Sequence, residues 1–423
     1  MTSILIKGGR VIDPSRNVDG FFDVLTEDGL IKAVEAPGAI SGGDKVIEAQ
    51  GKWVLPGLID MHVHLREPGH EYKETVATGT RAAAAGGFTG VLAMPNTSPA
   101  IDNAEVVSSI LDKAKEAGFA RVWVAAAMTK GRKGEVLTEY EDLKAAGAVA
   151  VTDDGSWVSS PKVLRRVLDY AAVAGLLPLC HAEDHELAKG GAIHEGLVST
   201  RMGLPGIPAQ AEINAVTRDI NMVELSGKPL HFCHLSTRGA IEAVRTAKKK
   251  GLPVSCETAP HYLFLTHEDL GDYDTNAKMN PPLRTADDQA ALREALADGT
   301  IDAVATDHAP HSVLEKEVEF IDAAFGIIGL ETSLPLILEL VRAGVISPAR
   351  LVEVMSLNPA RLLNVEAGTL APGRTADVTI VDPEVEYTLK PADSKSLSRN
   401  SPFWNRPLKG RSVCTVVGGR IIQ

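Results

Sequence analysis

Two histidines lie one residue apart in the stretch IDMHVHLREPG, residues 59–69. They follow an apolar run typical of a buried strand. Because alternate residues of a strand share a face, the side chains of His62 and His64 are expected to point the same way, roughly 6.5–7 Å apart along the chain. Neutral imidazole suits zinc-like ions. A histidine pair by itself is more often an ordinary core or surface feature, so a metal site needs further ligands.

Four other stretches place an acid or a histidine at the end of an apolar run. His181 and His234 each follow a short strand-like segment, Asp307 follows another, and the pair Asp153-Asp154 follows AVAVT. Five or six candidate ligands are more than one zinc ion needs. They indicate a two-ion site in which one carboxylate bridges ions roughly 3.5–4 Å apart. The alternation of strand faces does not decide whether Asp153 or Asp154 is that bridge.

These residues recur at one position in a repeated pattern of elements. A short apolar run, a polar turn and a helix-like segment alternate along the chain, and several helix-like segments end in glycine, the usual residue just past a helix. The strand candidates, with the polar residues that follow them, span 53–67, 90–98, 121–131, 148–156, 177–184, 230–237, 253–262 and 301–311. Eight such units over about 300 residues predict an α/β fold, namely a (β/α)8 TIM barrel, at residues 55–363. The carboxyl ends of its strands, and hence the polar residues, would meet at one mouth.

The two ends of the chain differ from the middle. Both contain short alternating strands punctuated by Gly, Pro and Asp, which are typical of antiparallel hairpins. We therefore expect residues 1–54 and 364–423 to form one small β-sandwich domain with a structural role, and the barrel to be inserted between its two parts.

Composition limits the classes of partner. The chain has 423 residues, of which 44% are hydrophobic, and a formal net charge of -12. An acidic chain without long Lys/Arg blocks is not expected to bind nucleic acid or an anionic membrane. No apolar stretch could span a bilayer, and the first residues lack the apolar region of a signal peptide, so we expect a cytoplasmic protein. Four cysteines make no disulfide framework; Cys180, Cys233 and Cys256 are interpreted as small buried hydrophobes.

Several motifs together resemble a known family. HVHLREPG, MPNTSP, the DDG at 153–155, HAED, HLST, KMNPPLR and ATDHAPHSVLEK are similar to those of the cyclic amidohydrolases, and specifically of the bacterial dihydroorotases that keep a terminal β-domain. The resemblance covers essentially the whole chain. HxHxRxPG and TDHAPHxxxxK are specific to that group, whereas HxH and HAED mark only the wider superfamily of metal-dependent hydrolases.

The resemblance implies a set of metal ligands. It assigns His62, His64 and Asp307 to a first zinc ion and His181 and His234 to a second. Many relatives bridge the ions with a carboxylated lysine after the fourth strand, but this chain has no lysine there. The dihydroorotases that it resembles use an aspartate, and the spacing to the histidine of the fifth strand selects Asp154. Because aspartate is shorter than a carboxylated lysine, one of the two ions would be held less firmly. The number of ions bound at rest therefore stays open.

The resemblance also implies a substrate site. Dihydroorotate carries a carboxylate, which the guanidinium of Arg66 would bind as a fork, with Asn96 and His311 on the same carboxylate. Asn280 would contact the ring, and Phe325 and Gly326 would offer backbone groups to the ring amide. His64 is expected to border the substrate as well. Because the intervening residues 311–322 are polar and lack a clear strand, they are expected to form a mobile lid.

The implied reaction is the reversible conversion of N-carbamoyl-L-aspartate to L-dihydroorotate and water in de novo pyrimidine (UMP) biosynthesis. A hydroxide between the ions would attack the ring carbonyl, with Asp307 as general base and then general acid. A homodimer is the family expectation, and some relatives assemble with aspartate transcarbamoylase. Two alternatives are a hydantoinase or allantoinase, which would have the bridging lysine and no need of a carboxylate-binding cluster, and a non-catalytic scaffold for aspartate transcarbamoylase, which should have lost ligands.

Overall fold

The computed structural model describes residues 3–423 and contains the predicted barrel. Parallel strands follow the order β15-β14-β13-β10-β9-β8-β7-β6, and a parallel bridge between Val63 and His308 joins the last strand to the first. The strands are β6 (Leu58–Val63), β7 (Phe88–Ala93), β8 (Arg121–Ala126), β9 (Ala148–Thr152), β10 (Leu177–Cys180), β13 (Leu230–Phe232), β14 (Val254–Thr258) and β15 (Ala303–Val304). The closed sheet confirms the TIM-barrel prediction.

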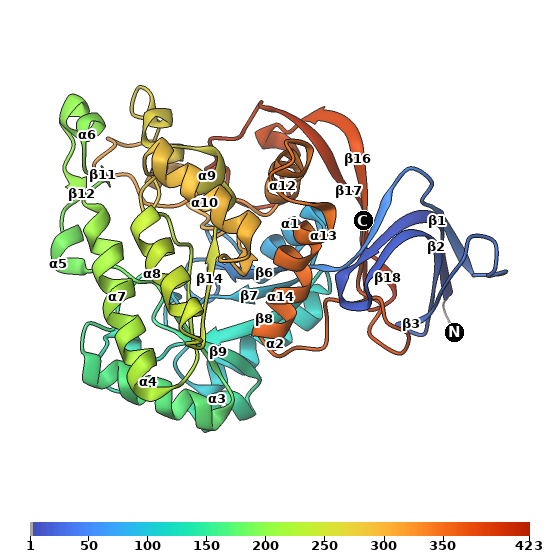
Figure 1. The fold of residues 1–423 in the computed structure, drawn as a ribbon, viewed down its shortest axis with the longest axis horizontal. Coiled ribbons are helices and arrows are strands. Elements are labelled where there is room, and N and C mark those ends of the chain that lie inside the picture. Colours follow the sequence, from blue (N-terminus) through green and yellow to red (C-terminus); the bar gives the residue numbers. More distant parts are fainter. Residues whose placement is uncertain (1–2) are drawn as a thin grey trace.

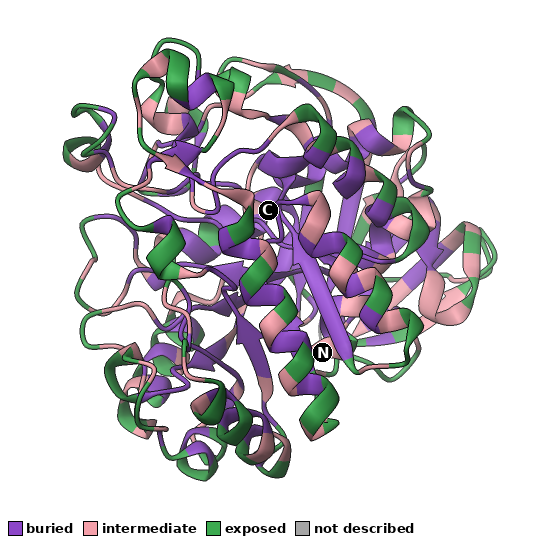
Figure 2. Ribbon diagram, turned by 60° about the vertical axis from the view of Figure 1, so that its left-hand side comes forward, coloured by how far each residue is buried: buried purple, intermediate pink, exposed green. Residues whose placement is uncertain are grey.

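Helices surround this sheet and cover its outer face. They are α1 (Val76–Gly86), α2 (Ala104–Ala117), α3 (Tyr140–Ala145), α4 (Pro161–Ala174), α7 (Ala209–Ser226), α8 (Arg238–Lys249), α10 (Ala286–Asp298) and α12 (Ser333–Arg342). Shorter helices lie in the loops and near the end of the barrel: α5 (His185–Ala188), α6 (Leu197–Met202), α9 (Pro260–Phe264), α11 (Val313–Lys316), α13 (Pro348–Val352) and α14 (Asn358–Leu362). Figure 2 shows buried strands at the centre and exposed outer faces on the helices.

The helix boundaries follow from local chemistry. Side chains of Asn103, Ser160 and Thr237 accept hydrogen bonds from free backbone N–H groups in the first turns of α2, α4 and α8. At the other end, Gly118 and Gly175 adopt left-handed conformations, with φ of 66° and 65°, that let the backbone leave the helix. The glycines that the sequence places after helix-like segments therefore end these helices.

The two ends of the chain form one separate sheet beside the barrel (Figure 1). Its strands are β1 (Ser3–Asp13), β2 (Val18–Glu27), β3 (Leu30–Glu35), β4 (Lys45–Glu48), β5 (Trp53–Pro56), β16 (Val378–Thr388), β17 (Pro407–Val417) and β18 (Arg420–Ile421). Antiparallel pairing of β5 with β16 joins the N-terminal and C-terminal parts. Apolar residues from both parts share one buried cluster, so the predicted terminal domain is present.

The limits of the domains stay a proposal at 1–54, 55–363 and 364–423. The terminal parts also reach the core of the barrel: the residues between β16 and β17 contribute Phe403 and pack Leu389 against it. A two-stranded pair, β11 (Ile193–His194) and β12 (Gly206–Ile207), lies outside both sheets. Across residues 3–423, no helix combines the length and apolar character needed to traverse a bilayer. All four cysteines are buried and unpaired, which agrees with the interpretation of Cys180, Cys233 and Cys256 as small buried hydrophobes.

Candidate active site

The six predicted metal ligands lie together at the carboxyl ends of the barrel strands. None is more than 5% exposed. They are His62 within β6, His64 just after it, Asp154 after β9, His181 after β10, His234 after β13 and Asp307 after β15. Five of them line a hollow of about 310 Å³. Parallel strands bring their carboxyl ends to the same rim, so residues up to 245 positions apart in the chain become neighbours.

The first group of ligand atoms surrounds one point. His64 Nε2 lies 3.0 Å from Asp307 Oδ1, and His62 Nε2 lies 3.6 Å from the same oxygen. Asp154 approaches both rings, at 3.2 Å from His62 Nε2 and 3.6 Å from His64 Nε2. Donors about 2.0–2.2 Å from a tetrahedral zinc ion must lie about 3.3–3.5 Å from one another. The observed spacings fit such a centre.

A second group of ligand atoms adjoins the first. His181 Nδ1 and His234 Nε2 are 3.1 Å apart. These nitrogens lie 3.9 Å and 3.7 Å, respectively, from Asp154 Oδ1. Asp154 therefore contacts both groups, as a bridging carboxylate must. Asp153 points elsewhere, because its carboxylate accepts hydrogen bonds from the amide and hydroxyl of Thr129.

Hydrogen bonds prepare two of the histidines to bind a cation. His62 Nδ1 contacts Glu257 Oε1 at 3.1 Å, and His64 Nδ1 contacts Asn96 Oδ1 at 2.8 Å. If each Nδ1 donates its proton to that oxygen, Nε2 keeps its lone pair for a metal. His62 Nε2 is buried and has no hydrogen-bond partner among residues 3–423. Such an atom is costly unless a ligand satisfies it, so the donor set fits a metal ion.

The charges point to the same conclusion. Burial opposes ionisation of Asp154 and Asp307, but the neighbouring histidines outweigh it, and the pKa of each carboxyl lies below its ordinary value. Burial also disfavours the charged form of His62, yet the same two carboxylates raise its pKa. Two ionised carboxylates in a buried site favour a positive charge between them.

Sequence reasoning missed a layer of residues behind these ligands. Glu257, on β14, contacts His62 Nδ1 through one oxygen and His231 Nε2, at 3.2 Å, through the other. His231 Nδ1 in turn lies 2.8 Å from Ser255 Oγ. All three residues are buried. The sequence held one signal for this network, an acidic residue inside the apolar run PVSCETA.

The predicted substrate-binding residues border the same hollow. Arg66 is buried; its Nε donates to Pro310 O at 3.1 Å, and its Nη2 lies 3.3 Å from His311 Nε2. Burial and the charge of Arg66 lower the pKa of His311 to about 2. His311 is therefore neutral near pH 7, and its Nε2 can accept the hydrogen bond from Arg66. The guanidinium supplies the positive charge at this end of the hollow.

The remaining predicted contacts differ in how far they are free to bind. Asn96 bonds His64 through Oδ1, and its Nδ2 lies 3.5 Å from Asp154 Oδ2. Asn280 donates to Glu183 at 3.2 Å, while its Oδ1 is buried without a partner among residues 3–423. Both side chains border the hollow. Asn96 already uses its oxygen and its amide group in hydrogen bonds, whereas Asn280 keeps a free acceptor for a ligand.

The backbone of Phe325 and Gly326 shows a similar contrast. Gly326 N donates to Lys278 O at 3.0 Å, and Gly326 O accepts from Lys316 Nζ at 3.1 Å and from Asn400. Phe325 lines the hollow, and its amide and carbonyl make no hydrogen bond to residues 3–423. Phe325, rather than Gly326, therefore has backbone groups available to a ligand.

The predicted lid contains the short helix α11. Two buried lysines hold this region: Lys316 Nζ donates to Ala324 O at 2.7 Å, and Lys278 Nζ donates to Phe320 O at 2.7 Å. Of the predicted lid, His311 lines the hollow, and the closing of this segment over the mouth stays a prediction.

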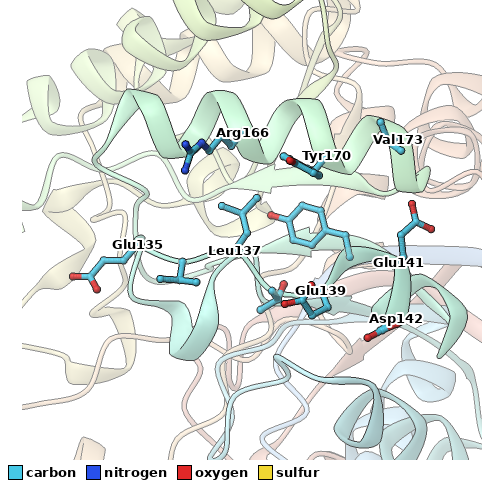
Figure 3. Close-up of a pocket in the computed structure, with 11 residues that line it drawn as sticks. Glu135, Leu137, Glu139, Glu141, Asp142, Arg166, Tyr170 and Val173 are labelled. Carbon is cyan, nitrogen blue, oxygen red and sulfur yellow. The ribbon is translucent and has the colours of Figure 1, made fainter.

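A larger groove, of about 610 Å³, lies away from this site (Figure 3). It is bordered by α3, α4 and the loop before α3, and its lining includes Leu137, Tyr140, Arg166 and Tyr170. None of the predicted ligand or substrate residues lines it. The barrel mouth is the candidate active site because of the chemistry of its side chains, although its hollow is smaller than this groove.

Comparisons with known proteins identify the family of the chain. A model of the dihydro-orotase-like family matches residues 51–240. The dihydroorotase of Geobacter metallireducens is 51% identical over 420 residues, which cover 99% of each chain. That of Syntrophotalea carbinolica is 53% identical over 418 residues, covering 99% of this chain and 98% of the relative. A solved L-hydantoinase (dihydropyrimidinase) from Arthrobacter aurescens superimposes with a TM-score of 0.87 at 28% identity, covering 100% of this chain and 96% of the other. The chain therefore belongs to the dihydroorotase family and is a hydrolase that acts on cyclic amides.

Proposed function

We propose that this protein catalyses the reversible hydrolysis of L-dihydroorotate to N-carbamoyl-L-aspartate, a step of de novo pyrimidine biosynthesis. One observation carries the proposal: a double donor set that shares Asp154 borders the same hollow as the buried guanidinium of Arg66. Cations held by these donors would polarise a ring amide carbonyl, and the guanidinium suits the carboxylate attached to that ring.

The cation that best matches these donors is zinc, because four imidazoles and two carboxylates form the set. His62, His64 and Asp307 would hold one ion, His181 and His234 would hold a second, and Asp154 would contact both. When bound, the ions would withdraw electrons from the ring carbonyl and make water a better nucleophile near neutral pH.

Asp307 is placed to move the proton in this reaction. Ring opening adds water across the amide C–N bond, so a proton must leave the attacking water and reach the departing ring nitrogen. The low pKa of Asp307 keeps its carboxylate ionised and ready to accept that proton. It then returns the proton to the nitrogen, as general base and then general acid. A weakly basic group can do this when it is held within reach of both atoms.

Other side chains orient the ring. Arg66 binds the substrate carboxylate, with Asn96 and His311 beside it. Asn280 Oδ1, which is buried without a partner among residues 3–423, accepts a hydrogen bond from the ring N–H. The free backbone groups of Phe325 bind the ring amide, and Gly326 packs behind them. His64 contributes its ring both to the donor set and to the wall of the hollow.

The two alternatives fit the site less well. A hydantoinase substrate lacks the carboxylate, so it would leave the buried charge of Arg66 without a counter-ion, and the bridge here is Asp154 instead of lysine. A scaffold without activity would not need the complete set of six donors. A homodimer, an association with aspartate transcarbamoylase and a cytoplasmic location stay predictions.

A substrate comparison tests the function. The purified metal-loaded protein is assayed for ring opening of dihydroorotate, hydantoin and allantoin, before and after chelation, and the metal content of the same samples is measured. We expect activity on dihydroorotate alone, loss on chelation, and recovery when zinc is added back. Preferred opening of hydantoin or allantoin, or full activity in metal-free protein, would contradict the proposal.

A further inference from the structure

The connection between β16 and β17 contains a segment, residues 394–400, with an unusual alternation. Ser394, Ser396, Ser398 and Asn400 are each at most 7% exposed, whereas the residues between them face outward or are half-buried. An extended segment normally turns its apolar side chains inward. This one turns polar side chains inward, so each must find a hydrogen-bond partner on the barrel.

The inward side chains fasten the segment to the rim of the barrel. Ser396 Oγ donates to the carboxylate of Glu74, and Ser398 Oγ donates to Lys73 O at 2.7 Å. Both acceptors lie between the loop that carries Arg66 and the start of α1. The terminal part of the chain therefore holds a fixed position beside the mouth.

Asn400 makes the contacts closest to the substrate site. Its Oδ1 accepts from His311 N at 3.0 Å, and its Nδ2 donates to Ala309 O at 2.9 Å and to Gly326 O at 3.0 Å. All three partners are backbone groups, and they belong to two separate segments of the rim. One planar amide thus ties the segment of His311 to the segment of Phe325 and Gly326.

The two tied segments touch each other directly. A Cβ atom added at Gly326 would lie only 2.7 Å from Ala309 O and 2.8 Å from the ring of His311. His311 Nε2 lies 3.3 Å from Arg66 Nη2, and Pro310 O accepts from Arg66 Nε. The orientation of the guanidinium is thus set by residues 310 and 311, and the backbone on both sides of residue 310 is bonded to Asn400.

We propose that Asn400, supplied by the terminal domain, is a positioning residue that sets the arrangement of Arg66 and His311 for recognition of the substrate carboxylate. This inference rests on the proposed function. Asparagine suits the role because it offers one acceptor and two donors in one plane. An aspartate would keep the bond to His311 N, but it would place a second oxygen against two carbonyl oxygens.

The test compares Asn400→Ala and Asn400→Asp with a matched control, Ser398→Ala. The control removes a buried hydrogen bond from the same segment without contacting residues 309–311 or 326. Steady-state kinetics on dihydroorotate give KM and kcat. Calorimetry gives the affinity of the metal-loaded protein for orotate and for orotate methyl ester, which lacks the negative charge.

We expect both Asn400 variants to raise KM about tenfold or more, because a small misplacement of binding groups is costly, while kcat stays within about twofold. The ratio of the affinity for orotate to that for its methyl ester should fall by the same factor as KM rises. Ser398→Ala should lower the thermal midpoint and leave KM and that preference unchanged.

Unchanged KM and ligand preference in a folded Asn400→Ala protein would overturn the inference, and so would a fall in kcat alone. If Asn400→Ala does not fold, Asn400→Ser, which keeps one hydroxyl, is judged by the same criteria. Failure of the proposed function shows differently, since the unaltered protein would then not open dihydroorotate, and both proposals would fall together.

Discussion

Replacing Glu257 by glutamine should weaken metal binding although Glu257 is not among the six proposed ligands. Both of its oxygens are used: Oε1 lies 3.1 Å from His62 Nδ1, and Oε2 lies 3.2 Å from His231 Nε2. Burial opposes ionisation, but hydrogen bonds from His231 and His62 outweigh it and lower the pKa of Glu257 to about 2. The residue is therefore an anion at neutral pH and increases the basicity of His62 towards a cation.

The size of the effect follows from this geometry. Glutamine is nearly isosteric and can still turn its single oxygen towards His62, so the ring orientation survives. What is lost is the charge: a hydrogen bond to an ionised group contributes about 1.5–3 kcal/mol, and a neutral one about 0.5–1.5 kcal/mol. The midpoints of these ranges differ by about 1.25 kcal/mol, or about eightfold in metal affinity, close to the lower end of the range known for groups behind metal ligands.

The measurement is a competition between the metal-free protein and a chelator of known zinc affinity, at one pH. Asp13→Asn serves as the control, because Asp13 is a buried carboxylate of the terminal sheet that bonds Ser15 and Leu370 and contacts no proposed ligand. Of these two variants, we expect only Glu257→Gln to lose zinc affinity. Equal zinc affinity in Glu257→Gln and the unaltered protein would refute the reasoning, as would an equal loss in the control.

Three further predictions address other parts of the molecule. Asp307→Asn should keep the fold, seen as an unchanged circular dichroism spectrum, but lose about 10²- to 10⁴-fold in turnover because the amide cannot take the proton; activity within tenfold of the original would contradict this. Arg66→Lys should raise KM for dihydroorotate about tenfold in steady-state assays, since an ammonium cannot bind the carboxylate as a fork, and an unchanged KM would count against the contact. Burial and the charge of Arg284 lower the pKa of His194 to about 4, so between pH 4 and 6.5 the unfolded chain binds more protons than the folded one. The free energy of unfolding should therefore fall by about 2 kcal/mol from pH 7 to pH 5, and His194→Gln should remove that part of the slope in urea titrations.

Much of the fold could be predicted from local patterns. Apolar runs that end in His or Asp, helix-like segments that end in glycine, and hairpin-like termini predicted the barrel and the terminal sheet, and the structure confirms both. The six ligand candidates could be named because imidazole and carboxylate at strand ends are chemically conspicuous. They meet because the carboxyl ends of parallel strands share one rim.

Other features depended on contacts that no local pattern encodes. The local pattern left Asp153 and Asp154 open as the bridge, and the family resemblance selected Asp154. In the folded chain Asp153 accepts hydrogen bonds from Thr129, whereas Asp154 lies beside His62. His194 is buried beside Arg284, which lies 90 positions away in the chain.

The sequence by itself determined which elements form and which residue types stand at their ends, because periodicity and capping act over a few residues. The tertiary structure alone decided that Glu257 lies behind His62, 195 positions away, and that Asn400 reaches His311 across 89. Such pairings depend on strand order, closure of the barrel and the path of a long connection, and these are set by packing of the whole chain.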